Sequence, residues 1–111
     1  MAEIRNVDVA EAAHLALQGA LLLDVRQDDE WDAGHAPDAR HVMLAELPDH
    51  VGSLDTERAI VCVCRSGGRS ARATAFLVEH GYNAVNLAGG MSAWAQEGQP
   101  LSAESGEPTV I

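Results

Sequence analysis

The sequence predicts an α/β domain in which helices cover both faces of a central, mostly parallel sheet. Residues 20–25 and 59–64 form apolar runs, interrupted only by Asp24, that are too short for helices and are typical of strands buried on both faces. Stretches whose apolar residues recur with helical spacing separate the expected strands. Because strands and helices alternate along the chain, a parallel sheet covered on both sides is the expected architecture.

The first half of the chain begins with a short expected strand over residues 4–7, followed by a helix. Asp8 can cap this helix, with Glu11 at its third position. Gly19 then ends the helix before the buried strand at residues 20–25. Its expected apolar face holds Val9, Ala12, Ala13, Ala16 and Leu17.

The second half repeats the alternation of strand and helix. Gly81 and Gly98 mark the ends of its two helices, because glycine commonly follows the last helical turn. The expected elements are a short strand at 40–43, a weak helical turn at 44–51, the strand at 59–64, a helix at 70–80, a strand at 84–87 and a helix at 91–97.

A single domain accounts for the length of 111 residues. We expect it to span residues 1–101, because residues 102–111 are rich in Ser, Glu, Gly and Pro and predict a loose, flexible tail. Seven Arg, no Lys and 17 acidic residues give a formal net charge of −10. This charge repels nucleic acid and anionic membrane surfaces, so neither is an expected partner. The lack of a long apolar segment predicts a cytoplasmic protein.

The two cysteines, Cys62 and Cys64, are separated by one residue. This spacing does not suit a disulfide along an extended strand, and it is not the CxxC pattern of zinc or redox sites. The histidines are scattered among different elements, so no metal site is expected. Cys62, with Val on either side, is expected to be a small apolar core residue.

Residues 64–70, Cys-Arg-Ser-Gly-Gly-Arg-Ser, are expected to form the functional loop. The segment runs from the end of a buried strand through a glycine turn into a helix, so its backbone N–H groups can converge on the Cys64 sulfur. Gly67 and Gly68 permit the positive φ that such a loop commonly requires. This setting lowers a cysteine pKa, and Cys64 is therefore expected to be an ionised nucleophile.

Basic charge is concentrated around this loop in the sequence. Residues 58–78 contain four Arg and no acidic residue, whereas the rest of the chain carries a net charge of −14. Arg65 and Arg69 favour the thiolate, and their guanidinium groups offer a rigid fork of donors to oxyanions. A small anionic substrate is the expected ligand.

The loop resembles the active-site loop of the rhodanese family of sulfurtransferases. Leu-Asp-Val-Arg at 23–26, Glu-Trp at 30–31 and Gly-His-Ala-Pro at 34–37 are similar to the family's N-terminal signature. Leu-Ala-Gly-Gly-Met-Ser-Ala-Trp at 87–94, followed by Gly-Gln-Pro-Leu at 98–101, is similar to its C-terminal signature. Three motifs in this order make the resemblance specific, and it implies a rhodanese-like three-layer fold.

The resemblance implies sulfur transfer by double displacement, which needs neither a metal nor an organic cofactor. Cys64 would attack the outer sulfur of thiosulfate or a related donor, carry that sulfur as a persulfide, and pass it to cyanide, a thiol or an acceptor protein. Arginine side chains would bind the oxyanion of the donor, and backbone N–H groups would hold the persulfide. The donor-binding residues implied in this way are Arg65, Ser66, Gly67, Gly68, Arg69 and Ser70.

Two other functions stay open at this point. Some Cys-dependent phosphatases and arsenate reductases share this fold, but their loop spacing is Cys-x5-Arg, whereas four residues separate Cys64 from Arg69. A non-catalytic binding module is the other alternative, and the presence of the cysteine and both arginines weighs against it.

Asp24 and Arg26, at the end of the strand at 20–25, are expected to be structural. Arg26 lies four residues before Glu30 and is expected to pair with it. His35 is a candidate general base, but we expect it to hydrogen-bond within its own turn, because a thiolate stabilised by N–H groups needs no base.

Overall fold

The computed structural model describes residues 3–111 and confirms the predicted α/β architecture. Five strands form one sheet in the order β1-β5-β4-β2-β3, and every neighbouring pair is parallel. The elements are β1 (Asn6–Val7), α1 (Val9–Leu17), β2 (Leu21–Asp24), α2 (Asp28–Ala33), β3 (Arg40–His41), η1 (Leu44–Glu46), α3 (Leu47–His50), η2 (Val51–Ser53), β4 (Ile60–Val63), α4 (Gly68–Glu79), β5 (Ala84–Leu87) and α5 (Gly90–Gln96).

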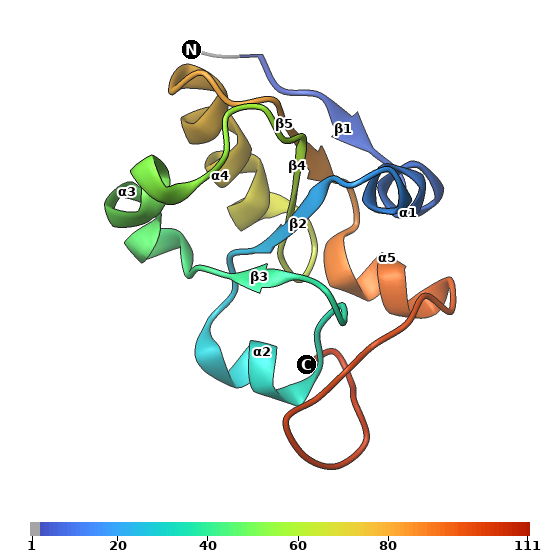
Figure 1. The fold of residues 1–111 in the computed structure, drawn as a ribbon. Helices are drawn as coiled ribbons and strands as arrows, with labels where there is room; N and C mark the ends of the chain where they lie inside the picture. Colours follow the sequence, from blue (N-terminus) through green and yellow to red (C-terminus); the bar gives the residue numbers. More distant parts are fainter. Residues whose placement is uncertain (1–2) are drawn as a thin grey trace.

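Helices cover both faces of the sheet (Figure 1). The helices α3 and α4 lie on one face, and α1 and α5 lie on the other. All four residues of the central strand β4 are buried, and they alternate between the two apolar clusters. Ile60 and Cys62 belong to one cluster, whereas Val61 and Val63 belong to the other. This arrangement explains the continuous apolar run, because neither face of the strand meets solvent.

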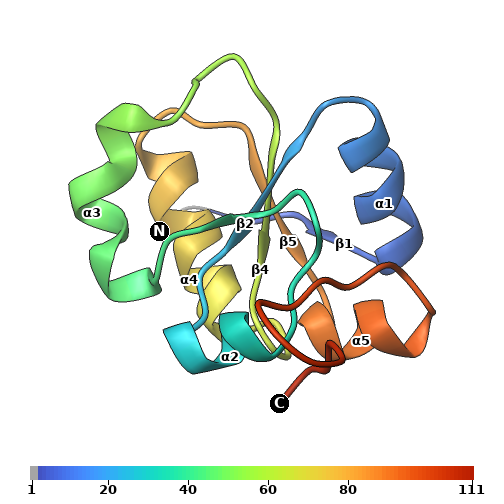
Figure 2. The ribbon, with the colours of Figure 1, turned by 60° about the horizontal axis from the view of Figure 1, so that its bottom comes forward.

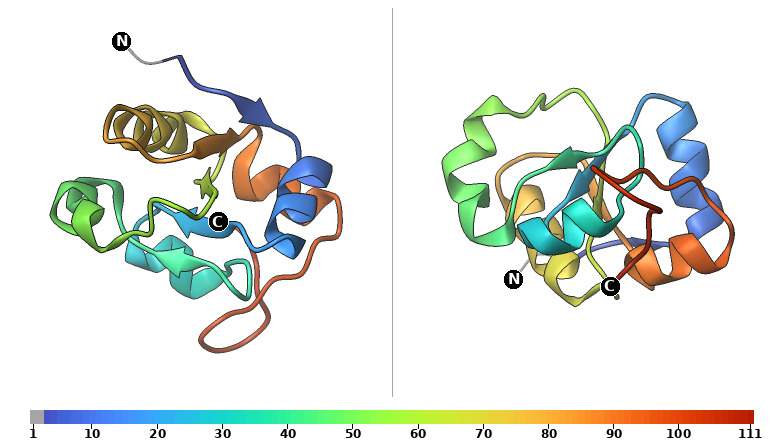
Figure 3. Two further views of the ribbon diagram at one scale, coloured as in Figure 1. Left: turned by 45° about the horizontal axis from the view of Figure 1, so that its top comes forward. Right: turned by 90° about the horizontal axis from the view of Figure 1, so that it is seen from below.

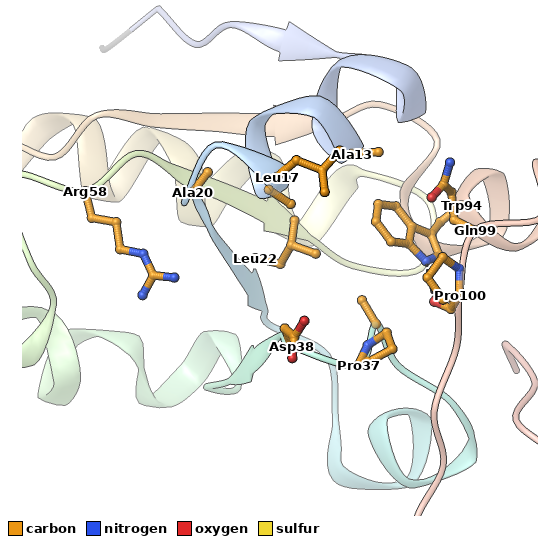
Figure 4. Close-up of a pocket in the computed structure, with 12 residues that line it drawn as sticks. Ala13, Leu17, Ala20, Leu22, Pro37, Asp38, Arg58, Trp94, Gln99 and Pro100 are labelled. Carbon is orange, nitrogen blue, oxygen red and sulfur yellow. Dashed lines mark hydrogen bonds between the residues drawn. The ribbon is translucent and has the colours of Figure 1, made fainter.

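The start of α1 is as predicted, but its last residue is not buried. The Asp8 side chain accepts a hydrogen bond of 2.8 Å from the backbone N–H of Glu11, and Gly19 follows the helix with φ +102°. Leu17, expected on the apolar face, is 87% exposed. Its side chain borders an open cavity instead of packing into the core (Figure 4).

The helix α2 was not expected from the sequence. None of its residues is buried, so it has no apolar stripe that periodicity could reveal. Its first turn is capped: the Glu30 carboxylate accepts a hydrogen bond of 3.1 Å from the backbone N–H of Gln27, which precedes the helix. Three acidic residues in its first turn complement the helix dipole.

The segment after α5 contacts the domain, although a loose tail was expected. Ser102 and His35 exchange two backbone hydrogen bonds of 2.9 and 2.7 Å, and the N–H of Thr109 donates to the Ala33 carbonyl at 2.9 Å. Val110 packs against one apolar cluster. The segment thus returns to the end of α2 (Figure 3). Composition did not reveal this placement, because backbone groups make most of these contacts.

One edge of the sheet gathers the polar segments. The carboxyl ends of β2 and β4, the helix α2 and the first turns of α4 and α5 lie together at the lower edge of Figure 2. Ligands of parallel sheets bind at this edge. Over residues 3–111, no helix is both long enough and apolar enough to span a membrane.

Candidate active site

The loop that carries Cys64 connects β4 to α4. Cys64 directly follows the last residue of β4, and α4 begins at Gly68, two residues earlier than predicted. Gly67 has φ +111°, a conformation that side chains strongly disfavour. Gly68, expected to share this freedom, does not have a positive φ and stands as the first helical residue.

The Cys64 sulfur accepts hydrogen bonds from the loop. The backbone N–H of Gly67 lies 3.1 Å from Sγ, and the Ser70 hydroxyl lies 3.3 Å from it. Burial by itself raises the pKa of Cys64, but hydrogen bonds from Ser70 and from the N–H groups of Gly67 and Ser66 outweigh burial and lower that pKa below its ordinary value. Cys64 is only 1% exposed, so a reactant must approach closely to reach the sulfur. The site favours a thiolate, as the sequence predicted.

The second cysteine has a different environment. Cys62 is fully buried within β4, and burial raises the pKa of its thiol to about 12. It therefore stays a thiol at neutral pH. The two cysteines are chemically distinct, although only one residue separates them.

Asn86 is a buried polar residue that the sequence analysis did not single out. It lies on β5 and is 3% exposed. Its Oδ1 accepts a 2.6 Å hydrogen bond from the Ser70 hydroxyl, and its Nδ2 donates to the Gly67 carbonyl at 3.2 Å and to Oδ1 of Asn6 at 2.9 Å. Asn86 thus holds Gly67 and Ser70, which each donate a hydrogen bond to the Cys64 sulfur. A lone amide inside a strand that is otherwise apolar was the signal available in the sequence.

The start of α5 holds the loop from the other side. The N–H of Met91 donates to the Cys64 carbonyl at 2.7 Å, and the N–H of Ser92 donates to the Arg65 carbonyl at 3.0 Å. Gly90 has φ +57°, and a Cβ at this position would lie 2.4 Å from the Cys64 carbonyl oxygen. The Gly-Gly pair at 89–90 therefore lets the end of a helix approach the loop backbone closely.

Only part of the expected basic charge is free at the loop. Arg65 is exposed and has no acidic partner among the residues that the structure describes. Arg69 forms a two-pronged ion pair with Glu30, with N···O distances of 2.6 and 2.8 Å. Arg58 lies at the other end of β4, where its Nε donates to the Gly19 carbonyl at 2.8 Å. The charge concentration seen in the sequence is therefore divided between two edges of the sheet.

The expected Arg26–Glu30 pair is wrong. Arg26 pairs with Asp24, and both side chains are completely buried. The Arg26 Nη2 lies 2.8 Å from an Asp24 carboxylate oxygen and also donates to the Gly34 carbonyl at 2.7 Å. A buried guanidinium needs a carboxylate that is also buried, and Asp24 at the end of β2 meets this need, whereas Glu30 lies nearer the surface.

His35 behaves as predicted. Its Nδ1 donates to the Trp31 carbonyl at 2.8 Å, so the ring is tied to its own turn. The ring also stacks on Trp31, with the two ring centroids 3.6 Å apart. The His41 ring also stacks on Trp31, at a centroid distance of 4.8 Å. These contacts fix the connection between α2 and β3.

A separate cavity of about 460 Å³ lies between α1, the start of β2 and the segment after α5 (Figure 4). Ala and Leu side chains with Trp94 form much of its wall, and Arg58 and Asp38 lie at its border. None of its lining residues belongs to the loop at 64–70. In the part of the chain from residue 3 onward, no cluster of His, Cys, Asp and Glu side chains is placed to hold a metal ion.

The sheet is parallel, and its central strand ends at a cysteine whose pKa is lowered by its own loop, a setting that suits a nucleophilic thiolate. Residues 8–97 match the model of the Rhodanese-like domain family, and the chain belongs to this family.

Named relatives cover most of the chain. It is 39% identical over 90 residues to a sulfurtransferase of Allochromatium vinosum, and the alignment covers 80% of this chain and 84% of that protein. It is 33% identical over 95 residues to the thiosulfate sulfurtransferase GlpE of Pseudomonas syringae, with 85% and 90% covered. The crystal structure of a rhodanese-like domain protein from Staphylococcus aureus has a TM-score of 0.82 at 32% identity and covers 92% of this chain and all of that one. These matches support a rhodanese-type sulfurtransferase.

Proposed function

We propose that this protein transfers sulfane sulfur from a small anionic donor such as thiosulfate through a persulfide on Cys64. The observation that carries the proposal is the Cys64 sulfur at the carboxyl end of β4, which accepts hydrogen bonds from Gly67 and Ser70. The relatives named as sulfurtransferases support the same chemistry.

In the first half-reaction, the Cys64 thiolate attacks the outer sulfur of thiosulfate. A new S–S bond forms to Cys64, the S–S bond of thiosulfate breaks, and sulfite leaves with the electron pair of that bond. The convergent N–H groups of the loop stabilise negative charge on the persulfide. In the second half-reaction, cyanide, a thiol or an acceptor protein attacks the outer sulfur, and Cys64 leaves as the thiolate.

The loop supplies the donor site in this proposal. Arg65 is exposed and free to bind the donor's oxyanion, and the Ser66 hydroxyl lies beside it at the surface. Ser70 and the backbone of Gly67 contact the sulfur directly, and Gly68 and Arg69 contribute N–H groups from the first turn of α4. The domain of residues 1–101 would hold every catalytic group.

The test compares the two cysteines. We expect Cys64→Ser to abolish thiocyanate formation from thiosulfate and cyanide, and Cys62→Ser to retain most of it, with circular dichroism confirming that both variants are folded. Incubation with thiosulfate alone should add one sulfur atom to the Cys64 peptide in mass spectra. Equal activity losses in the two variants, or an added sulfur on Cys62, would contradict the proposed division of roles.

The same preparation tests the phosphatase alternative. The loop separates Cys64 from Arg69 by four residues and leaves the Arg69 guanidinium bound to Glu30, so we expect negligible hydrolysis of aryl phosphates. Hydrolysis at a rate comparable to the thiosulfate reaction would assign the protein to phosphoryl chemistry instead.

A further inference from the structure

Glu30 and Arg69 form an ion pair between α2 and the first turn of α4. The Arg69 Nη1 donates to Oε1 of Glu30 at 2.6 Å, and its Nη2 donates to Oε2 at 2.8 Å. The Glu30 side chain is 13% exposed and that of Arg69 is 35% exposed. The Glu30 carboxylate also accepts the N–H of Gln27, so the helix start fixes its position. Hydrogen bonds from Arg69 lower the pKa of Glu30 to about 2, and the carboxylate stays ionised at neutral pH.

The pair changes the charge that surrounds the Cys64 sulfur. Arg69 lies close enough to Cys64 and Glu30 for both to raise the pKa of its guanidinium, with the Glu30 hydrogen bond as the largest cause. Arg26 is neutralised by Asp24. Within residues 3–111, Arg65 is therefore the cation of the loop that has no carboxylate partner.

We propose that Glu30 is a specificity-determining residue that masks the charge of Arg69, so that Arg65 is the side chain that attracts an anionic donor to Cys64. This inference rests on the proposed function in its choice of donor. Whatever the donor, the inference states that Glu30 sets how strongly Cys64 prefers an anionic reactant over a neutral one. Glu30 touches neither reactant and acts through Arg69.

Glu30→Gln tests whether Glu30 neutralises the charge of Arg69, with little change in the shape of the side chain. Glutamine has the same length and can still accept the Gln27 N–H, so the start of α2 keeps its cap. The substitution removes the negative charge and leaves Arg69 uncompensated. Asp29→Asn is the matched control, because Asp29 lies on the same helix, is exposed, and has no ion pair among the described residues.

The readout is the rate of Cys64 alkylation by iodoacetate, an anion, divided by the rate with iodoacetamide, which is neutral. The same thiolate attacks both reagents, so a change in its pKa cancels from the ratio. In water-like surroundings, a unit charge at a distance of about 7 Å changes the encounter with an anion roughly threefold. We expect the ratio to rise about threefold in Glu30→Gln, to fall back on addition of salt, and to stay near the wild-type value in Asp29→Asn.

A second variant keeps the test decisive if Glu30→Gln does not fold. The double variant Glu30→Gln with Arg69→Gln replaces a neutral pair by a neutral pair. We expect its ratio to return toward the wild-type value. A ratio that falls well below wild type in the double variant would show that Arg69 itself attracts anions in the native protein. An unchanged or lower ratio in folded Glu30→Gln would also overturn the inference.

Thiosulfate kinetics extend the test to the proposed reaction. We expect Glu30→Gln to lower KM for thiosulfate about threefold while kcat changes little, because the mask acts on the approach of the donor. A raised KM or a large loss of kcat would show that Glu30 only supports the structure of the site. If wild-type protein transfers no sulfur, the proposed function fails, and the alkylation ratio still decides the masking of Arg69.

Discussion

The Ser70 hydroxyl has one proton and two acceptors within reach. One is the Cys64 sulfur at 3.3 Å, and the other is Oδ1 of Asn86 at 2.6 Å. A hydroxyl donates one hydrogen bond at a time, so Asn86 competes with the thiolate for this proton. The extent to which Ser70 stabilises the thiolate therefore depends on the network built around Asn86.

We predict that Ser70→Ala shifts the pH dependence of Cys64 alkylation upward. The lowered pKa of Cys64 places the midpoint for wild-type protein below that of a free thiol, near 8.5. Loss of the hydroxyl removes a donor to the charged form, so the midpoint rises and alkylation at neutral pH slows several-fold. A pH–rate profile with iodoacetamide measures both values. Ser53→Ala is the control, because Ser53 bonds only to Arg40 and His50 in the structure.

The buried Asp24–Arg26 pair leads to a prediction about stability. Asp24→Asn leaves the Arg26 charge buried without compensation, which costs about 3–5 kcal/mol in comparable pairs. We expect a loss of this size in the free energy of unfolding in urea. Asp32→Asn, an exposed position on α2, should change it little. Similar midpoints for the two variants would show that water reaches Arg26.

Single residues could be predicted where their role depends on chain neighbours. Cys64 in its loop, Asp8 at its cap and His35 in its turn all follow from residues within a few positions. The partner of Arg26 could not be chosen correctly, because Asp24 and Glu30 are both near in sequence and only the packed structure shows which is buried. The Ser70–Asn86 contact joins residues far apart in the chain and has no local signal.

At the scale of elements, the candidate site is held between three helix starts. The chain enters α4 through the loop itself, α5 donates N–H groups to the loop carbonyls, and Glu30 on α2 binds Arg69. The loop therefore cannot shift without breaking contacts to other elements. Such support is what a preorganised anion site requires.

The two glycines at 68 and 90 are predicted to differ sharply. Gly90→Ala forces a positive φ on alanine, at about 1–2 kcal/mol, and drives a Cβ against the Cys64 carbonyl. Displacement of the loop should lower sulfur transfer about 10–100-fold. A Cβ on Gly68 meets no atom within 4 Å, so Gly68→Ala should keep activity and stability. Steady-state kinetics and thermal melts measure both, and a tolerated Gly90→Ala would contradict the close contact.

The elements themselves were largely predictable. Every expected strand is present, and residues 84–87 match β5 at both ends. The helix α4 starts two residues earlier than expected because its first residues are Gly-Arg, which show no apolar period. The helix α2 was not predicted, because none of its residues is buried and its sequence therefore shows no apolar period.

At the scale of the whole molecule, the C-terminal segment closes the structure around α2. A Cβ added at Gly34 would lie 2.3 Å from the Thr109 carbonyl oxygen, so the two backbones are in direct contact. Gly34 has an extended φ of 173°, which any residue adopts, and close approach is therefore the only demand for glycine here. The sequence could not reveal this contact, because it joins backbone groups 75 residues apart.

We predict that truncation after Leu101 destabilises the fold. It removes the two hydrogen bonds between Ser102 and His35, the bond from Thr109 to Ala33, and the packing of Val110. At about 0.5–1.5 kcal/mol for each hydrogen bond, the expected loss is about 2–4 kcal/mol. Truncation after Thr109 keeps all three bonds and should cost less than about 1 kcal/mol. Urea denaturation measures both losses, and an unchanged midpoint in the longer truncation would restore the loose tail expected from composition.

Gly34→Ala shows whether this loss comes from the docked segment itself. In the full chain, the added methyl group pushes Thr109 away from Gly34, so the free energy of unfolding should fall by an amount similar to that of truncation. In the chain truncated after Leu101, the same methyl group meets no Thr109, and the substitution should be nearly neutral. If the two changes act on the same contact, the loss of stability in the chain that carries both is smaller than the sum of the two separate losses. The coupling energy of this double-mutant cycle is therefore the deciding quantity. Additive losses would mean that Gly34 is required by α2 alone, and that the C-terminal segment stabilises the protein elsewhere.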